Sequence, residues 1–172
     1  MKYYICQIIL NGNRLFVLWY ENEINGVKTE SNQLIYANNI PELLQYSEIK
    51  SLLVDINSIT QYECLDFSNV EIWLNKPEAH INCEYFLNIW NILIDVISSK
   101  KSNSLFLDLA EDEKGIHIYN ELFWGANLPG YTPPGKIHIP DWRLEDISKL
   151  QTILINGHEE LTDIILSGRE VR

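Results

Sequence analysis

Residues 83–99 read CEYFLNIWNILIDVISS, and this stretch decides how the rest of the chain is expected to fold. Its polar residues are spaced alternately four and three apart, which places them on one narrow stripe of a helix. They are Glu84, Asn88, Asn91, Asp95 and Ser98. Because apolar side chains cover the rest of the circumference, we expect a central helix that is packed on several sides, with Asn82 as its N-cap.

The residues that open the chain predict an antiparallel meander. Runs 3–10 and 14–21 are rich in β-branched and aromatic residues and are joined through Asn11-Gly12, a pair typical of two-residue hairpin turns. Asn25-Gly26 predicts a second turn, and residues 33–37 predict a third strand. Apolar side chains occupy both faces of the first two strands, so we expect each face to be covered.

Shorter elements are predicted between the meander and the central helix. Asn39 and Pro41 are typical of a capped helix start, and this helix is expected to run to about Glu48. Residues 52–54 are a candidate strand, whereas residues 57–64 have no clear period. Asp66 is expected to cap a further helix that ends at Asn75, and its inward residues are expected to be Val70, Trp73 and Leu74.

The second half of the chain predicts two more helices around a proline-rich loop. One helix is expected from residues 111–113 to Trp124, ended by Gly125 in a left-handed conformation. Its expected apolar side is Ile116, Tyr119, Leu122 and Phe123. Residues 105–109 are apolar but fit no single type of element. Residues 126–142 contain four of the six prolines, which predicts two turns flanking an extended piece at 136–139.

The last helix is expected to begin near Asp141 or Arg143, with Asn156-Gly157 as a candidate break. Its expected inward residues are Leu144, Ile147, Leu150, Leu154 and Leu161. Together these elements predict a single α+β domain, in which a β-rich part (1–56) packs against a mainly helical part (57–172). The Ala126–Pro140 loop is expected to be held between the last two helices.

The composition favours an acidic protein of a reducing compartment, with the cytoplasm as the expected location. The net charge of −11 repels nucleic acid and anionic membranes and attracts a basic partner. No apolar run approaches the roughly 20 residues of a membrane-spanning helix. The opening MKYYICQIIL lacks the pattern of a signal peptide. The three cysteines are unclustered, which does not suggest a disulfide framework.

The sequence contains no recognised catalytic or nucleotide-binding motif, so we expect no catalytic, metal or cofactor site. His80 and Cys83 have the spacing of two metal ligands but lack a second pair. A cysteine nucleophile at Cys64 or Cys83 has no feature that favours a thiolate. Three histidines remain as an alternative enzymatic site, together with nearby carboxylates, and these are His117, His138 and His158.

Acidic side chains are the candidate contacts with a basic partner. The candidates are Glu21 and Glu23 near the first turns, Glu111, Asp112 and Glu113 before a helix, and Asp141 with its neighbours Glu145 and Asp146. The alternative interpretation is that these are ordinary solvated charges. Aromatic residues without a basic patch do not predict a nucleic-acid surface, and they fit core packing and one protein interface better.

Residues 118–142, IYNELFWGANLPGYTPPGKIHIPDW, resemble the pattern IYxxLFWGxNLPxxTPxGxxxIPxW. This pattern is similar to that of a family of small acidic bacterial proteins that includes immunity proteins of contact-dependent growth inhibition and related toxin systems. Residues 86–91 and 1–10 also resemble that family. The motif residues have a structural character and are Trp124, Gly125, Asn127, Pro129, Pro140 and Trp142. The family has Ser after the last Trp where this chain has Arg143, so Asp141 is the candidate helix cap.

The resemblance implies a cytoplasmic inhibitor that binds the toxin domain delivered by a neighbouring cell. Such toxins are often basic nucleases, and the inhibitor needs neither catalysis nor a cofactor. Two alternatives stay open at this point. One is a small enzyme that uses the histidines and carboxylates of the second half, and the other is a homo-oligomeric interaction module formed through the apolar hairpin.

Overall fold

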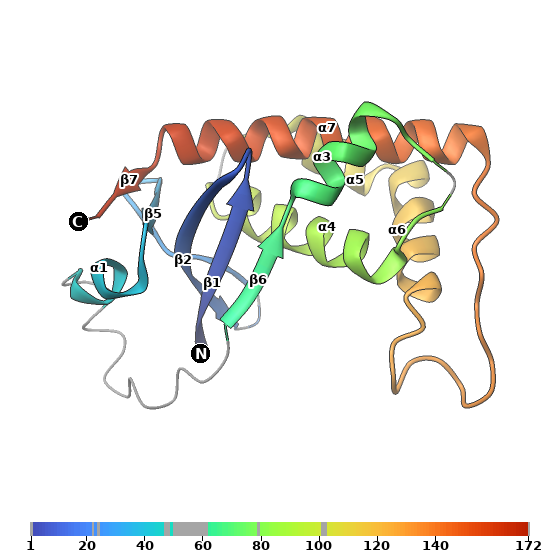
Figure 1. The fold of residues 1–172 in the computed structure, drawn as a ribbon. Helices are drawn as coiled ribbons and strands as arrows, with labels where there is room; N and C mark the ends of the chain where they lie inside the picture. The colour runs from blue at the N-terminus through green and yellow to red at the C-terminus, as the bar shows by residue number, and fades with distance from the viewer. Residues whose placement is uncertain are drawn as a thin grey trace. The chain divides into compact units, whose positions relative to one another are not determined.

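The computed structural model describes residues 2–21, 23, 25–46, 49, 62–78, 80–100 and 103–171. It confirms the α+β class: the described residues form a mixed seven-stranded sheet built mainly from N-terminal residues, and six helices that lie mostly in the C-terminal half (Figure 1). The chain divides into two compact units. Unit 1 comprises Met1–Ser68, Asp95–Ser102 and Leu161–Arg172, and unit 2 comprises Asn69–Ile94 and Asn103–Glu160. Within the described residues, no helix combines the length and the apolar character needed to span a membrane.

The sheet belongs to unit 1, and its strand order is β4-β5-β2-β1-β6, with β3 paired to β2 and β7 paired to β5. The strands are β1 (Lys2–Leu10), β2 (Asn13–Glu21), β3 (Gly26–Val27), β4 (Thr29–Glu30), β5 (Gln33–Ala37), β6 (Tyr62–Asp66) and β7 (Arg169–Glu170). The predicted meander is confirmed, because β2 pairs antiparallel with both β1 and β5. Strands β6 and β7 were not predicted; they pair parallel with β1 and β5, respectively, and make the sheet mixed.

The first hairpin turn forms as predicted, and the second ends one residue earlier than predicted. Asn11 and Gly12 have φ angles of 49° and 73°, as a two-residue type I′ turn requires, and Leu10 pairs with Asn13. The second turn was predicted at Asn25-Gly26; β2 and β3 pair antiparallel with Tyr20 opposite Gly26, so the chain reverses just before Gly26, which itself begins β3. A further tight turn forms at residues 31–32, between β4 and β5, where both φ angles are positive.

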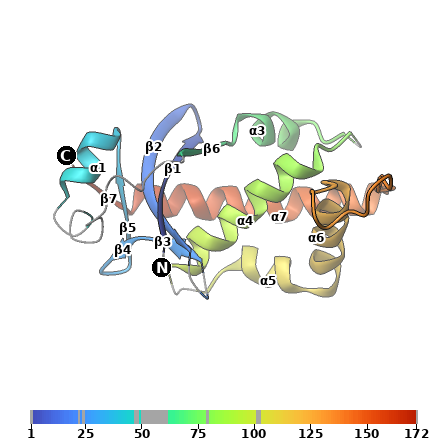
Figure 2. The ribbon, with the colours of Figure 1, turned by 90° about the horizontal axis from the view of Figure 1, so that it is seen from below.

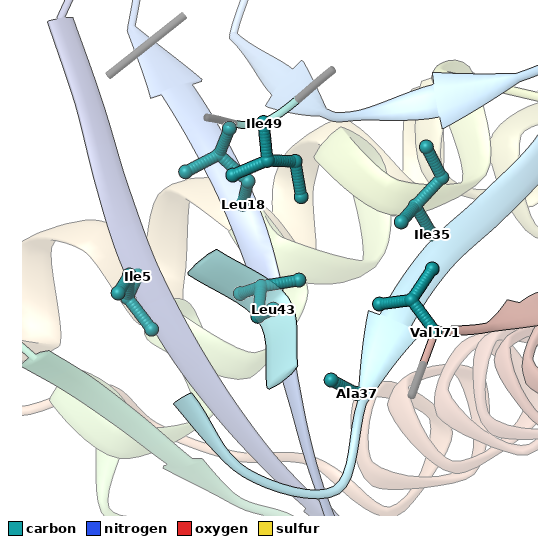
Figure 3. Packing of buried hydrophobic residues seen from close by; sticks show 7 residues of the cluster. All are labelled: Ile5, Leu18, Ile35, Ala37, Leu43, Ile49 and Val171. Atoms are coloured by element: carbon teal, nitrogen blue, oxygen red, sulfur yellow. The ribbon is translucent and has the colours of Figure 1, made fainter. Parts of the chain in front are cut away.

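Both faces of the central strands are buried, as their apolar pattern predicts. On one face, Ile5 and Leu18 lie in a cluster with residues of α1 (Ile40–Gln45), β5 and the end of β7 (Figure 3). This cluster consists of Ile5, Leu18, Ile35, Ala37, Leu43, Ile49 and Val171. On the other face, the Trp19 indole Nε1 donates a hydrogen bond of 2.7 Å to the Asp95 carboxylate, in the last turn of α4 (Cys83–Ser98).

The predicted start of α1 is confirmed. The Asn39 side chain accepts a hydrogen bond of 3.0 Å from the Glu42 backbone N–H, and Pro41 lies in the first turn, where its missing N–H costs nothing. Figure 2 shows α1 beside β5 in unit 1. The helix ends at Gln45 rather than near Glu48. Glu48 and the candidate strand at 52–54 lie outside the described residues.

The helix predicted after Asp66 is α3 (Ser68–Asn75), and its predicted end is confirmed. The Asp66 carboxylate accepts a hydrogen bond of 2.9 Å from the Ser68 backbone N–H. Val70 and Trp73 are buried and Leu74 is half-buried. Asp66 itself ends β6, a strand that begins within the stretch for which no period was predicted.

Helix α4 follows the prediction closely. Its N-cap is Asn82, whose side chain accepts a hydrogen bond of 3.1 Å from the Tyr85 backbone N–H. The polar stripe is exposed except at Asp95, which is half-buried, while the apolar residues around it are buried or half-buried. Helices α4 and α7 (Leu144–Leu166) each contribute residues to both units.

The remaining helices of unit 2 correct several predictions. Residues 105–109 fall in α5 (Leu105–Glu111), and the next helix is α6 (Glu113–Gly125), which ends one residue beyond its predicted last helical residue. Ile116 was expected to face inward but is 51% exposed, and Ile118 is the buried residue of that turn. The structure places the α6 backbone so that the buried stripe runs through residues 115, 118 and 122.

Helix α7 is continuous, so the candidate break at Asn156-Gly157 is wrong. Gly157 is buried, and a Cβ atom on it would lie 2.8 Å from both Leu93 and Phe106. A glycine here allows close helix packing and does not mark a helix end. Leu144 was expected to be inward and is 86% exposed, because it begins the helix.

The start of α7 is not capped by Asp141. The Asp146 carboxylate accepts a hydrogen bond of 3.3 Å from the Arg143 backbone N–H instead. Asp146 is buried and its other oxygen lies 2.8 Å from the Lys114 ammonium. Burial opposes ionisation of Asp146, but the hydrogen bonds from Lys114 and from the Arg143 backbone outweigh it and lower the pKa of the carboxyl.

Candidate protein-binding surface

Residues 126–143 connect α6 to α7 (Figure 1), and we call this segment the proline loop. The proline loop and the end of α6 expose large apolar side chains. Tyr131 is 65%, Ile137 77% and Ile139 83% exposed, and Trp124 at the end of α6 is 45% exposed. Several large exposed apolar side chains within one short segment are typical of protein-interaction sites. All of these residues belong to unit 2.

The base of the proline loop depends on Gly125, but not for the predicted reason. Gly125 does not adopt the left-handed conformation, which Asn127 adopts instead with a φ angle of 50°. A Cβ atom on Gly125 would lie 2.6 Å from the Cys83 Sγ atom and 2.6 Å from the Pro140 Cγ atom. Gly125 therefore allows the end of α6 to approach Pro140 closely.

The Asn127 side chain fastens the two limbs of the proline loop together. Its amide Nδ2 donates to the His138 carbonyl oxygen at 3.0 Å, and its Oδ1 accepts from the His138 backbone N–H at 2.8 Å. The same Nδ2 also lies 2.9 Å from the Gly125 carbonyl oxygen. The side chain of Asn127 thus bonds both the backbone N–H and the backbone C=O of His138, as a residue of a neighbouring antiparallel β-strand would.

Turns and aromatic contacts order the rest of the proline loop. Gly130 and Gly135 both have positive φ angles, and Pro129 forms an isolated bridge with Thr132. The Phe123 ring makes edge-to-face contacts with Trp124 and with Tyr131, at centroid distances of 5.2 Å and 5.3 Å. The Phe123 ring therefore packs against both exposed aromatic rings, which present a defined surface.

An apolar hollow of about 170 Å³ lies between α4, α5 and α6 in unit 2. Its lining residues are Trp90, Ile94, Leu107, Ala110, Glu111, Ile116 and Tyr119. The hollow explains the exposure of Ile116, whose side chain forms part of its wall. A hollow of this size has room for one apolar side chain of a partner.

The predicted acidic cluster at residues 111–113 lies beside this hollow, and its members have different roles. Glu111 lines the hollow. Asp112 caps α6 by accepting a hydrogen bond of 2.7 Å from the Gly115 backbone N–H, and it also pairs with Lys149. The hydrogen bond from Lys149 is the main reason why the pKa of Asp112 is lowered. Glu113 is exposed in the first turn of α6.

The other predicted acidic contacts lie in separate places. Glu21 ends β2 in unit 1 and accepts a hydrogen bond of 3.0 Å from the Tyr4 hydroxyl, and Glu23 is exposed in the same unit. Asp141 is exposed in the proline loop. Unit 2 contains 13 acidic and 5 basic side chains, so most of the net charge lies in the unit that carries the proline loop.

Two of the three candidate histidines pair with different carboxylates. The His138 Nε2 atom lies 3.3 Å from Glu121, and the His158 Nε2 atom lies 3.3 Å from Glu71. His117 is exposed on α6. None of the three lines the hollow between α4, α5 and α6. A second hollow is lined by Trp73, Tyr85 and other residues, and the one histidine among its lining residues is His80.

Cys83 is buried, whereas the neighbouring His80 is exposed. Burial raises the pKa of the Cys83 thiol, and the nearby Glu121 carboxylate adds to the shift, while hydrogen bonding with the backbone and with Trp142 opposes it. The net effect disfavours the thiolate that a metal ion or a nucleophilic role requires. Cys64 is exposed at β6. Among the described residues, no group of three His, Cys, Asp or Glu side chains is arranged to hold a metal ion.

The proline loop was predicted to have a structural role, and the exposure of its two isoleucines, Ile137 and Ile139, was not predicted. The available indication was the alternation of Ile137 and Ile139 around a histidine, in a stretch bounded by prolines that no neighbouring strand was predicted to cover. Trp124, one of the motif residues with a predicted structural character, is 45% exposed. Comparison of the chain with models of protein families, with curated proteins and with solved structures finds no match.

Proposed function

We propose that this chain is an immunity protein that binds and neutralises the toxin domain of a contact-dependent inhibition system. The expected toxin is a basic nuclease, and the inhibitor acts in the cytoplasm by one-to-one binding, without catalysis or a cofactor. The observation that carries the proposal is the proline loop, which holds exposed apolar side chains in a fixed arrangement on the more acidic unit. The resemblance of residues 118–142 supplies the class of partner.

The energetics of protein interfaces support this role for the loop. A few aromatic anchors supply most of the binding energy of a typical interface, which buries about 1,600 Å² in total. Trp124 and Tyr131 are exposed, and both contact Phe123, so they are available as anchors without first being ordered. The negative charge of the chain would speed the approach of a basic toxin domain.

The test begins with the genes beside the one that encodes this chain. We expect a large secreted toxin next to it, and we expect the C-terminal domain of that toxin to form a one-to-one complex with the purified chain in titration calorimetry. Trp124→Ala should weaken this complex by about 30-fold, the effect of losing an interface hot spot of about 2 kcal/mol. Ile72→Ala is the matched control, because Ile72 is 69% exposed in α3 and lies outside the loop.

Three results would count against the proposal. Genes that encode no secreted toxin, or a toxin domain that does not bind, would remove its partner. Conversion of a small substrate by the purified chain, at a rate abolished by replacing one histidine, would support the enzyme alternative. A solution mass above 20.1 kDa without any partner would support the homo-oligomer.

A further inference from the structure

The backbone of the proline loop has one edge in use and one edge open. Residues 136–143 contain no turn or bend. In an extended chain, the N–H and C=O groups of neighbouring residues point to opposite edges. His138 uses its own pair on Asn127, so the pairs of Ile137 and Ile139 point to the opposite edge. Among the described residues, neither isoleucine has a hydrogen-bond partner.

We propose that residues 136–139 of the proline loop accept an extended segment of the toxin domain as an added strand on this open edge. The inference rests on the proposed function, because the toxin supplies the strand. Asn127 already takes the place of a strand on one edge, so the partner would complete a small sheet around His138. Main-chain hydrogen bonds would supply affinity, and the two exposed isoleucine side chains would select an apolar partner face.

The charge of unit 2 favours a basic toxin strand over a second copy of this chain. With 13 acidic and 5 basic side chains, two copies of this unit would repel each other, whereas Lys or Arg residues of the toxin would be attracted. Glu121 and Asp141 lie next to the segment, the first paired with His138 and the second exposed. Both are carboxylates that a basic partner strand would reach.

The open edge is limited to a short pairing by the structure at its two ends. A turn at residues 134–135 precedes the segment, and α7 begins at Leu144 shortly after it. Pro140 alternates with Ile139 as His138 does, so its missing N–H lies on the edge that Asn127 occupies, and the donors of Ile137 and Ile139 stay in place. Natural proteins use short edge strands to prevent an exposed edge from pairing indefinitely with other copies. The edge is thus long enough for a specific partner and too short to template aggregation.

The test compares two variants of one residue against the toxin C-terminal domain by titration calorimetry. Ile139→Ala removes the apolar side chain but keeps the backbone N–H, and we expect it to weaken binding by about tenfold. Ile139→Pro also removes the N–H donor, and we expect a further loss of about tenfold. Equal affinities for the two variants would overturn strand addition while leaving toxin binding intact. Absence of binding by the unaltered chain would overturn the proposed function instead.

Hydrogen exchange of the unaltered chain provides a second measurement that does not depend on the variants. In the free chain, the amide of His138 should exchange slowly, and those of Ile137 and Ile139 should exchange rapidly. Addition of the toxin domain should slow the exchange of both isoleucine amides. Unchanged exchange in the complex would refute the inference, and slow exchange with a doubled mass in the free chain would show that a second copy occupies the edge.

Discussion

Replacing Gly125 with alanine should destabilise the chain, although the conformation of Gly125 alone predicts the opposite. Gly125 is the last residue of α6 and its φ angle is not positive, so helix propensity favours alanine by up to about 1 kcal/mol. The added methyl group would, however, lie 2.6 Å from the Cys83 Sγ atom and 2.6 Å from the Pro140 Cγ atom, whereas ordinary contacts begin near 3.4 Å. Overpacking costs about 1 to 3 kcal/mol, and two contacts as short as 2.6 Å favour the upper part of this range, about 2 to 3 kcal/mol. After the gain of about 1 kcal/mol in helix propensity, we expect a net loss of about 1 to 2 kcal/mol.

Urea unfolding followed by circular dichroism is the assay. With a denaturant slope of about 1–3 kcal/mol per molar urea, the unfolding midpoint should fall by roughly 0.5–1 M at an unchanged slope. The double variant Cys83→Ala/Gly125→Ala removes one of the two close contacts. The loss of unfolding free energy in the double variant should therefore be smaller than the sum of the losses in the two single variants, because neighbouring substitutions are coupled.

Gly130→Ala is the matched control, because a Cβ atom there meets no atom within 4 Å but the φ angle is +90°. Its cost of about 1 to 2 kcal/mol comes from backbone strain alone and should not depend on Cys83. A Gly125→Ala variant as stable as the unaltered chain, or more stable, would refute the close-approach explanation.

The other predictions concern two carboxylates and the clamp in the proline loop. Asp146→Asn should cost about 1 to 3 kcal/mol at neutral pH, because it weakens the contact with Lys114. The pKa of Asp146 is lowered in the folded state. The difference in unfolding free energy between the unaltered chain and the variant should therefore have its full size above the ordinary aspartate pKa of about 3.9, and it should vanish as the pH falls through the pKa of the folded state. Urea unfolding across that pH range measures this difference. Burial raises the pKa of Asp95, and the hydrogen bond from Trp19 opposes this shift. The stability that Asp95 supplies therefore falls as the pH rises above about 3.9. Asp95→Asn should reduce this pH dependence, as measured by comparing unfolding at about pH 4 and at about pH 7. Asn127→Gly keeps the left-handed conformation but removes three hydrogen bonds, and it should lower the unfolding free energy by about 1 to 3 kcal/mol and speed hydrogen exchange of the amide it binds. Slow exchange in that variant would show that the clamp does not hold the loop.

Elements with strong local patterns could be predicted from the sequence. Helix α4 has a polar stripe, an asparagine cap and no competing pattern, and its observed bounds differ from the prediction by one residue. The turn at Asn11-Gly12 and the start of α1 at Asn39 depend on the conformations of a few residues, which the residue types largely determine.

Features that depend on distant contacts could not be predicted. Strand β7 has only two residues, and its pairing with β5 joins parts of the chain more than a hundred residues apart. Gly157 looks like a helix end in the sequence because nothing local shows that Leu93 and Phe106 lie against it. Chain pattern alone gives no measure of exposure, so Ile116 was placed in the core when it lines a hollow.

The candidate site was predicted in part. The acidic character of residues 111–113 and the turns of the proline loop were visible in the sequence, but the division of roles was not. Asp112 and Asp146 carry charges that are paired within unit 2, whereas Glu113 and Asp141 remain exposed. Which carboxylate meets a lysine is decided by helix packing, and no spacing rule within one helix reveals it.

The parallel pairing of β7 with β5 has a consequence for biosynthesis. Val171 lies in the same buried cluster as Ile35 and Leu43, so unit 1 cannot close that cluster until residues 169–171 have left the ribosome. The meander formed earlier would wait during translation with part of its apolar face uncovered. Premature termination a few codons before Arg169 should therefore yield a product that chaperones retain or proteases remove, even though nearly every strand of the sheet has been made.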